Sequence, residues 1–171
     1  QSGFLMPSFQ TSNNSGTSIQ IPYYKVISER KDLTLFPRVF FGNEILLQTE
    51  YRQANKESDL ILDFSINRDE KNTKNHFFAD LSSNKQNQVL NLHLESVSND
   101  TYLKKNNITS PIIDDNSSLH SYINYNSFNE DSSFDISFEV FENLNKQKSD
   151  RYEYLFPKFE YEKYLYTNSN I

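Results

Sequence analysis

The stretch from Thr17 to Tyr51 reads TSIQIPYYKVISERKDLTLFPRVFFGNEILLQTEY. It contains three apolar and aromatic runs, which are separated by a charged loop at Glu29 to Asp32 and by a Gly42-Asn43 pair. A Gly-Asn pair between two such runs is typical of a β-hairpin. The stretch therefore predicts three neighbouring antiparallel strands.

Two of these runs contain a proline in the middle, Pro22 and Pro37. Proline has no N–H to donate to a neighbouring strand, so it normally lies at sheet edges or bulges. We expect Pro157, in the last aromatic run, to follow that rule. Pro22 and Pro37 interrupt two neighbouring strands at matching places, which predicts a locally weak pairing in the sheet.

The rest of the chain alternates apolar and polar residues with a period of two, most clearly in Asp59 to Ile66, Gln88 to Val97 and Phe134 to Val140. No helical period competes with this pattern. We expect roughly nine strands in an all-β, antiparallel up-and-down meander. Residues 1 to 16 are expected to be a lead-in, and Asn99 to Ser118 a long polar connection.

The alternation gives each strand one apolar and one polar face. The apolar face would be the core of a soluble sandwich, or the lipid-facing surface of an outer-membrane barrel whose polar face lines a wet lumen. The alternation alone does not choose between these two structures. An arginine at Asp63, Glu95 or Asp135 is expected to be mild, because the polar face is expected to meet water. The residues expected to share the apolar face are Leu60, Leu62, Leu90, Leu92, Phe134, Ile136 and Phe138.

The composition excludes several classes of protein. The formal net charge of −6 disfavours general nucleic-acid binding. The absence of cysteine excludes a disulfide or a cysteine metal site within the chain. The 14 Phe and 11 Tyr residues favour strands and would suit the aromatic girdles of a membrane barrel. The first ten residues, QSGFLMPSFQ, do not resemble a signal peptide, which predicts an internal part of a longer protein.

Residues that could carry chemistry are sparse. His76, His93 and His120 are far apart in the sequence without metal-ligand spacing, and Asp114-Asp115 lies in a polar loop where both carboxylates should be solvated. With three glycines in the chain, no phosphate-binding loop can be written, and no serine has a recognisable histidine partner. We therefore expect no catalytic residue, no cofactor and no metal site.

Five motifs occur in a family-specific order: SGFLMPSF at Ser2 to Phe9, IPYY at Ile21 to Tyr24, LTLFPR at Leu33 to Arg38, SVSNDTYLKK at Ser96 to Lys105, and YEYLFPKFEY at Tyr152 to Tyr161. Together they resemble the start of the barrel domain of the LptD family, the outer-membrane lipopolysaccharide-assembly proteins, also called organic solvent tolerance proteins.

The resemblance implies that residues 1–171 are the N-terminal strands of a large transmembrane β-barrel, with an upstream periplasmic domain and the remaining strands outside the chain. It implies transport of lipopolysaccharide and its insertion into the outer leaflet of a Gram-negative outer membrane, without enzymatic chemistry or nucleic acid. The implied lateral gate lies at Pro22, Pro37, Tyr23 and Tyr24. The implied partners are a plug lipoprotein, LptE, and a periplasmic bridge protein, LptA, which docks on the upstream domain.

Two alternatives remain open at this point. A different outer-membrane barrel, such as a porin or a nutrient receptor, would share the alternation but should lack a proline pair in adjacent strands. A soluble β-sandwich module, for example one that binds glycans, would share it as well.

Overall fold

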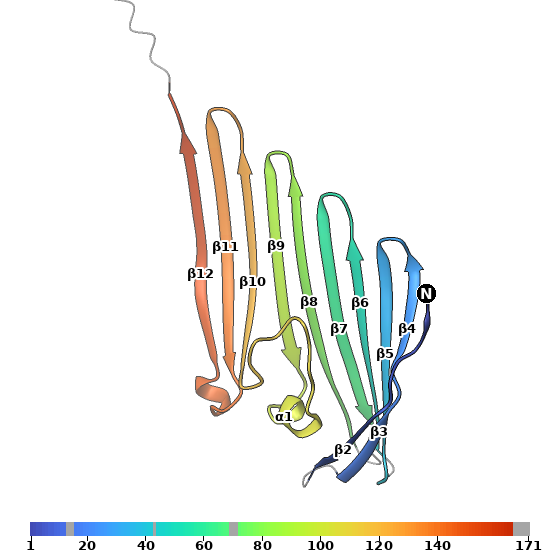
Figure 1. The fold of residues 1–171 in the computed structure, drawn as a ribbon. Coiled ribbons are helices and arrows are strands. Elements are labelled where there is room, and N and C mark those ends of the chain that lie inside the picture. The colour runs from blue at the N-terminus through green and yellow to red at the C-terminus, as the bar shows by residue number, and fades with distance from the viewer. Residues whose placement is uncertain (13–15, 43, 69–71, 166–171) are drawn as a thin grey trace, which may run out of the picture.

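The computed structural model describes residues 1–12, 16–42, 44–68 and 72–165. It is one antiparallel sheet, and from β4 to β12 each strand pairs with the next strand along the chain (Figure 1). The predicted all-β, up-and-down meander is confirmed. The elements are β1 (Gly3–Phe4), β2 (Ser8–Ser12), β3 (Gly16–Gln20), β4 (Tyr23–Ser28), β5 (Lys31–Phe40), β6 (Ile45–Ala54), β7 (Ser58–Arg68), β8 (Thr73–Lys85), β9 (Gln88–Val97), α1 (Tyr102–Asn106), β10 (Ser118–Phe128), β11 (Ser132–Asn143), the 3₁₀ helix η1 (Lys148–Asp150) and β12 (Tyr152–Lys163).

The N-terminal part differs from the expectation. Residues 1 to 16, expected as a lead-in, contribute β1 and β2, which pair with β4 and β3 respectively. The first expected strand is divided into β3 and β4 at Ile21 and Pro22. Parts of three expected turns, at residues 13–15, 43 and 69–71, lie outside the described residues.

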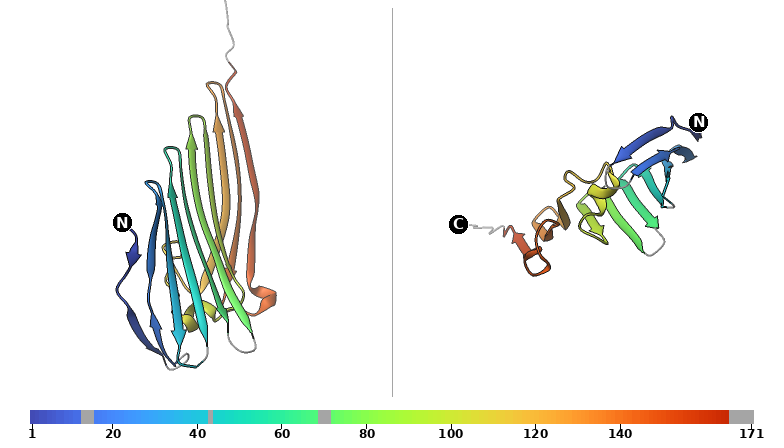
Figure 2. Two further views of the ribbon diagram at one scale, coloured as in Figure 1. Left: turned by 90° about the vertical axis from the view of Figure 1, so that its right-hand side faces the viewer. Right: turned by 90° about the horizontal axis from the view of Figure 1, so that it is seen from below.

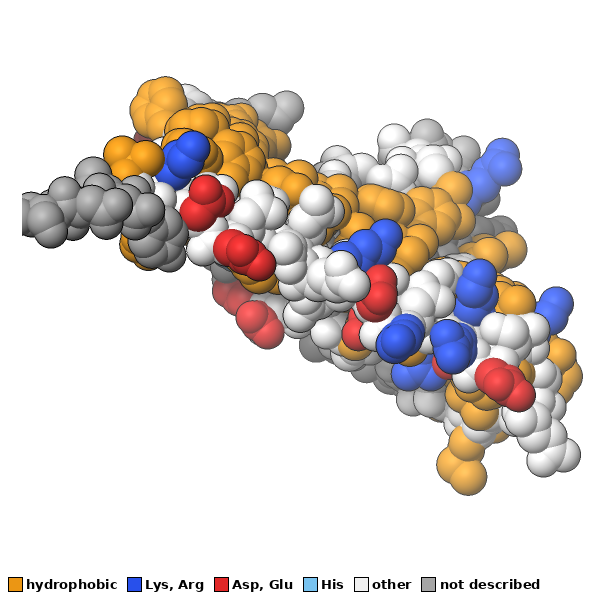
Figure 3. Space-filling view, turned by 90° about the horizontal axis from the view of Figure 1, so that it is seen from above, with side chains coloured by type: hydrophobic (Ala, Val, Ile, Leu, Met, Phe, Trp, Pro, Cys, Tyr) orange, Lys and Arg blue, Asp and Glu red, His pale blue; other side chains and the backbone are white. Residues whose placement is uncertain are grey.

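The strand register places all even-numbered residues of β7 on one face of the sheet and all odd-numbered residues on the other. Phe64 pairs with Phe77 on one face, and Asp63 pairs with Phe78 on the other. We call these the apolar face and the polar face. The seven leucine, isoleucine and phenylalanine residues expected to share a face all lie on the apolar face. The short hairpin turns, such as Glu29-Arg30 and Gln86-Asn87, lie at one end of the sheet (Figure 1). Seen from that end, a band of hydrophobic side chains runs along one side of the sheet, with charged side chains beside it (Figure 3).

Within the described residues the sheet stays open. β1 and β2 at one edge and β12 at the other each pair with a single strand. The described part of the chain also contains no helix that is long and apolar enough to cross a membrane.

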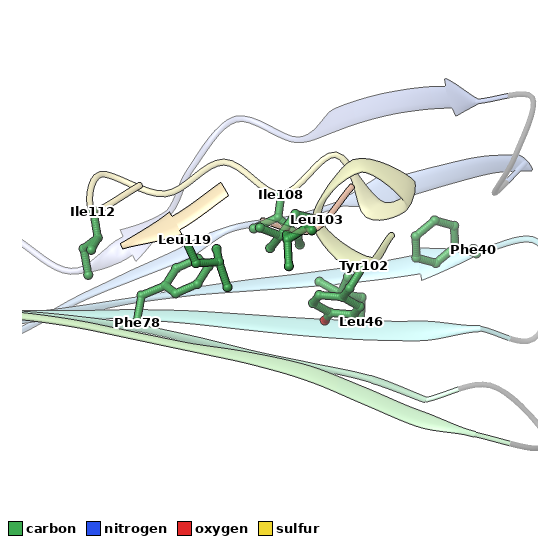
Figure 4. Close-up of a cluster of buried hydrophobic side chains, with 9 residues drawn as sticks. Phe40, Leu46, Phe78, Tyr102, Leu103, Ile108, Ile112 and Leu119 are labelled. Atoms are coloured by element: carbon green, nitrogen blue, oxygen red, sulfur yellow. The ribbon is translucent and has the colours of Figure 1, made fainter. Parts of the chain in front are cut away.

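The segment Ser98–Ser117, which connects β9 to β10, lies against the polar face near the end opposite the short hairpins (Figures 1 and 2). The long connection expected at Asn99 to Ser118 is present, but it also contributes buried side chains to the core, which was not expected. Tyr102, Leu103, Ile108 and Ile112 pack with residues of the strands beneath them (Figure 4). The buried cluster consists of Phe40, Leu46, Phe78, Tyr102, Leu103, Ile108, Ile112, Leu119 and Leu144.

The end of α1 explains how so short a helix brings two apolar residues together. Asn107 adopts the left-handed conformation, with φ of 48°. Its N–H donates to the carbonyl of Lys104 at 3.3 Å, and the N–H of Ile108 donates to the carbonyl of Leu103 at 3.0 Å. This pair of bonds is the Schellman motif, which usually includes an apolar contact between the two residues that Leu103 and Ile108 occupy here.

Replacing Leu103 with alanine should lower the free energy of unfolding by about 2–5 kcal/mol, because the side chain is fully buried and leaves a cavity. The matched control is Leu94→Ala, since Leu94 is 36% exposed on the apolar face. Urea unfolding of the full-length protein in detergent measures both changes. Equal losses in the two variants would contradict a core on the polar face.

Candidate functional site

Three prolines, Pro7, Pro22 and Pro37, recur at an interval of 15 residues in the sequence. The structure places them in three adjacent strand positions at the N-terminal edge of the sheet, one proline in each. β1 and β2 form an interrupted edge strand that is broken at Leu5 to Pro7, and β3 and β4 form a second one that is broken at Ile21 and Pro22. β5 continues through Pro37 and pairs with both β3 and β4.

At the break, each of these strand positions keeps one backbone hydrogen bond to the next. The N–H of Leu5 donates to the carbonyl of Pro22 at 2.8 Å, and the N–H of Ile21 donates to the carbonyl of Pro37 at 3.2 Å. In a hydrogen-bonded antiparallel pair, the two residues normally exchange two such bonds. The second bond cannot form in either pair, because Pro22 and Pro37 have no N–H.

The edge strand also carries an extra residue at the break. Phe4 pairs with Tyr23 and Ser8 pairs with Gln20, so the three residues from Leu5 to Pro7 lie opposite two. One extra residue on one strand of a pair is a β-bulge, which bends the strand and disrupts its hydrogen-bond ladder. Missing donors and a bulge therefore coincide at one level of the sheet.

The other predicted gate residues take different faces. Tyr23 lies on the apolar face, where its ring contacts Phe4 edge-on with centroids 5.1 Å apart. Tyr24 pairs with Thr34 and so lies on the polar face. The sequence interpretation missed Pro7, although the repeated 15-residue interval would have indicated it. Pro157 follows the positional rule, since Phe156 and Pro157 form a bulge opposite Phe138.

Buried polar side chains link the segment Ser98–Ser117 to the strands beside this break. Arg38, which follows Pro37, is almost fully buried. Its Nη1 donates to the carbonyl of Asn106 at 2.5 Å, while its Nε and Nη2 donate to Oε1 of Gln20 in β3 at 2.8 and 2.6 Å. One guanidinium therefore connects α1, β5 and β3.

A second buried network lies deeper under α1. The Nδ1 and Nε2 atoms of His76 lie 2.6 Å from Oγ of Ser65 and 3.2 Å from Oδ1 of Asp63. The hydroxyl of Tyr102 lies 2.6 Å from the same Ser65 Oγ, and Gln48 donates to Asp63 at 3.0 Å and to the carbonyl of Thr109 at 2.9 Å. Burial raises the pKa of Tyr102 to about 12, against the opposing effect of the Ser65 hydrogen bond, so its hydroxyl stays protonated at neutral pH.

Two predictions from the sequence need correction here. Ser65, His76 and Asp63 do form a serine–histidine–carboxylate arrangement, which sequence spacing did not reveal. All three side chains are fully buried and Ser65 is bonded to Tyr102, so this arrangement holds the segment in place and leaves no room for a substrate. An arginine at Asp63 would not be mild, because it would bury a charge without a partner.

The other candidates remain near the surface. His93 and His120, distant in sequence, lie on the polar face with ring centroids 6.4 Å apart. Asp115 is fully exposed, and hydrogen bonds from the hydroxyl and the N–H of Ser117 lower the pKa of its carboxyl. Among the described residues, no group of three or more His, Cys, Asp or Glu side chains is arranged to hold a metal ion.

Replacing Arg38 with glutamine should loosen the segment Ser98–Ser117, because hydrogen bonds to a charged group stabilise by about 1.5–3 kcal/mol. A cysteine placed at the buried Ile108 would report the loosening, since this chain has no cysteine of its own. We expect maleimide to label that cysteine about tenfold faster in the Arg38→Gln protein. Arg52→Gln is the control, because Arg52 is on the same face with an exposed side chain. Similar labelling rates in both proteins would show that Arg38 does not hold the segment.

No family model matches the chain. Three curated relatives are each named LPS-assembly protein LptD. The protein from Pseudomonas entomophila (strain L48) is 41% identical over 59 residues, or 34% of this chain; that from Ralstonia nicotianae (strain ATCC BAA-1114 / GMI1000) is 39% identical over 62 residues, or 36%; and that from Cupriavidus pinatubonensis (strain JMP 134 / LMG 1197) is 33% identical over 106 residues, or 60%.

These alignments cover 6%, 8% and 13% of the respective relatives, so the chain corresponds to a small part of each of them. Similarity to LptD proteins over as much as 60% of this chain therefore confirms the predicted resemblance to that family.

Proposed function

We propose that this chain is part of a transmembrane β-barrel in the outer membrane of a Gram-negative bacterium, and that the whole protein delivers lipopolysaccharide to the outer leaflet. The observation that carries the proposal is the burial pattern of the sheet. The apolar face is exposed, and the polar face is the one that another part of the chain covers.

Exposed apolar side chains extend across the sheet from β7 to β12. Phe64, Phe77 and Phe159 are 41%, 43% and 65% exposed on the apolar face. A soluble sandwich would bury such a face against a second sheet. The core under the segment Ser98–Ser117 lies instead on the polar face, so a hydrocarbon environment is the partner that suits the apolar face. This favours the barrel over the soluble glycan-binding module.

The strand lengths support a membrane-spanning arrangement. β5 to β12 contain 10 to 13 residues each, and a tilted transmembrane strand needs about 9–11. Short turns such as Glu29-Arg30 and Gln86-Asn87 lie at one end of the sheet, and the long segment Ser98–Ser117 emerges at the other. Outer-membrane barrels have short periplasmic turns and longer outer loops, so the short turns would face the periplasm.

The break at the prolines would be the lateral gate. An unsatisfied backbone group costs more in hydrocarbon than in water, so the missing bonds of Pro22 and Pro37 weaken the edge strands most within the membrane. The acyl chains of lipopolysaccharide would leave sideways at this edge while the sugar stays along the polar face. A porin or nutrient receptor needs no such break, and the similarity to LptD proteins also favours the gate.

The partners of the proposed function are those that the family resemblance implies. They are lipopolysaccharide as the transported molecule, the lipoprotein LptE as a plug, and the bridge protein LptA, which would dock on a domain outside this chain. The proposed role involves no covalent chemistry.

An arginine at Leu92 should cost about 2–4 kcal/mol if this residue lies near the membrane midplane, whereas one at its neighbour Asn91 on the polar face should be mild. Both residues lie in β9, on opposite faces of the sheet. Folding of the full-length protein into lipid vesicles, followed by urea titration, measures the difference. Equal costs would argue against a lipid-facing apolar face.

Replacing both Pro22 and Pro37 with alanine should supply the two missing N–H donors, each worth roughly 0.5–1.5 kcal/mol in water and more in lipid. The barrel should assemble at normal levels but deliver less lipopolysaccharide to the cell surface, and single replacements should have smaller effects. Surface lipopolysaccharide is measured in cells whose only copy carries the changes.

The matched control for this experiment is Pro157→Ala, which alters a bulge at the opposite edge of the described sheet. Its surface lipopolysaccharide should remain normal. Undiminished delivery by the Pro22 and Pro37 double variant, at normal protein levels, would mean that these prolines are only tolerated breaks.

A further inference from the structure

Four aromatic rings form a continuous ladder across β9, β10 and β11 on the polar face. His93 stacks on Tyr122 with centroids 5.2 Å apart and an interplanar angle of 6°. Tyr122 contacts His120 at 5.0 Å, and His120 stacks on Phe141 at 4.2 Å and 5°. His93 and Phe141 are directly opposite Tyr122 and His120 in the strand register. The ladder is therefore held by three rigid strands.

The ladder borders a hollow of about 400 Å³. The segment Ser98–Ser117 supplies Asp114 and Asp115 to its rim. Phe141 also lines it and is 37% exposed on the polar face. Small-molecule sites occupy about 300–1,000 Å³ and combine aromatic walls with a few polar groups. The hollow has both properties.

The polar groups at the hollow are mainly hydrogen-bond acceptors. The two ring nitrogens of His93 each lie 2.8 Å from a carboxylate oxygen, one of Asp80 and one of Glu95. Ionised carboxylates only accept hydrogen bonds, so each ring nitrogen of His93 faces an acceptor. Asp114 and Asp115 add two further carboxylates at the rim.

The carboxylates outnumber the two histidines of the ladder, because Glu139 also lies beside it, 3.1 Å from Nε2 of His120. An anionic ligand would be repelled from such a site. A ligand that donates several hydrogen bonds and presents an apolar ring face would be accommodated.

We infer that this hollow is a sugar-binding subsite for uncharged or amino-bearing pyranose rings. Such a ring packs its C–H face against Phe141, the exposed end of the ladder, and donates its hydroxyl hydrogens to the carboxylates. The subsite rests on the proposed function, in which the sugar portion of lipopolysaccharide passes along the polar face. It would contact the phosphate-free part of that sugar.

The test uses the full-length protein in a detergent without a sugar headgroup. Saturation-transfer difference NMR follows two probes, neutral maltotriose and anionic glucose 6-phosphate. Maltotriose should give a saturable signal and glucose 6-phosphate should not. Replacing both Tyr122 and Phe141 with leucine should weaken maltotriose binding roughly three- to tenfold.

The matched control replaces Tyr125 and Phe138 with leucine, since these rings lie on the apolar face of the same two strands. Its maltotriose binding should remain at the wild-type level. No saturable maltotriose signal in the wild type, or the same loss in both double variants, would overturn the subsite.

A second variant leaves the strands untouched. Replacing Asp114 and Asp115 with asparagine alters only exposed loop side chains and removes two of the five carboxylates, so glucose 6-phosphate should give a stronger signal than with the wild type. An unchanged glucose 6-phosphate signal would overturn the charge argument. Maltotriose binding is measured separately from lipopolysaccharide transport. Normal lipopolysaccharide delivery without maltotriose binding would refute only the subsite. Maltotriose binding without lipopolysaccharide delivery would refute only the proposed function.

Discussion

The backbone hydrogen-bond ladder is the constraint on which the rest of this structure depends. Every strand from β5 to β11 pairs with a neighbour on both sides, which is the condition that a strand must meet inside a hydrocarbon layer. Pro22 and Pro37 leave the backbone hydrogen bonding incomplete at one place in the sheet. The pairs Leu5–Pro22 and Ile21–Pro37 each keep one bond where two are normal, and a bulge lies at the same level. The missing donors and this bulge therefore coincide at the N-terminal edge of the described sheet.

Because the apolar face of the sheet is exposed, the buried core of the described residues does not lie on that face. The segment Ser98–Ser117 supplies a core on the opposite side, where Leu103 and Ile108 pack on apolar strand residues and Arg38 bonds to α1. Arg38 follows Pro37 directly and also holds Gln20 of β3. The covering segment is therefore joined to the strands next to the break, as well as to the strands under it.

Alternation was enough to predict most of the fold. Together with apolar runs and turn residues it identified the strands from β5 onward, and it assigned seven apolar residues to one face, because side-chain direction in a strand follows directly from residue parity. It could not identify β1, which is two residues long, or the core role of the segment Ser98–Ser117. The apolar residues of that segment follow neither a strand nor a helix period, and they are buried only because the segment folds back.

The candidate site was predictable only in part. Pro22 and Pro37 could be paired because a short loop joins their strands, but Pro7 lies in a segment that shows no strand pattern. The buried network of Asp63, Ser65 and His76 joins adjacent strands at one level, and register of this kind is set by turns and tertiary packing. Ser65 likewise bonds to Tyr102, a residue 37 positions away in the chain.

Hydrogen–deuterium exchange of the full-length protein in lipid nanodiscs tests the central claim, which is local weakness of the ladder at the prolines. Ile21 lies opposite Pro37, which is in the same row of the sheet as Leu47 and Ile66. We predict that the amides of Leu5 and Ile21 exchange at least about tenfold faster than those of Leu47 and Ile66. Equal protection across this row would contradict the account.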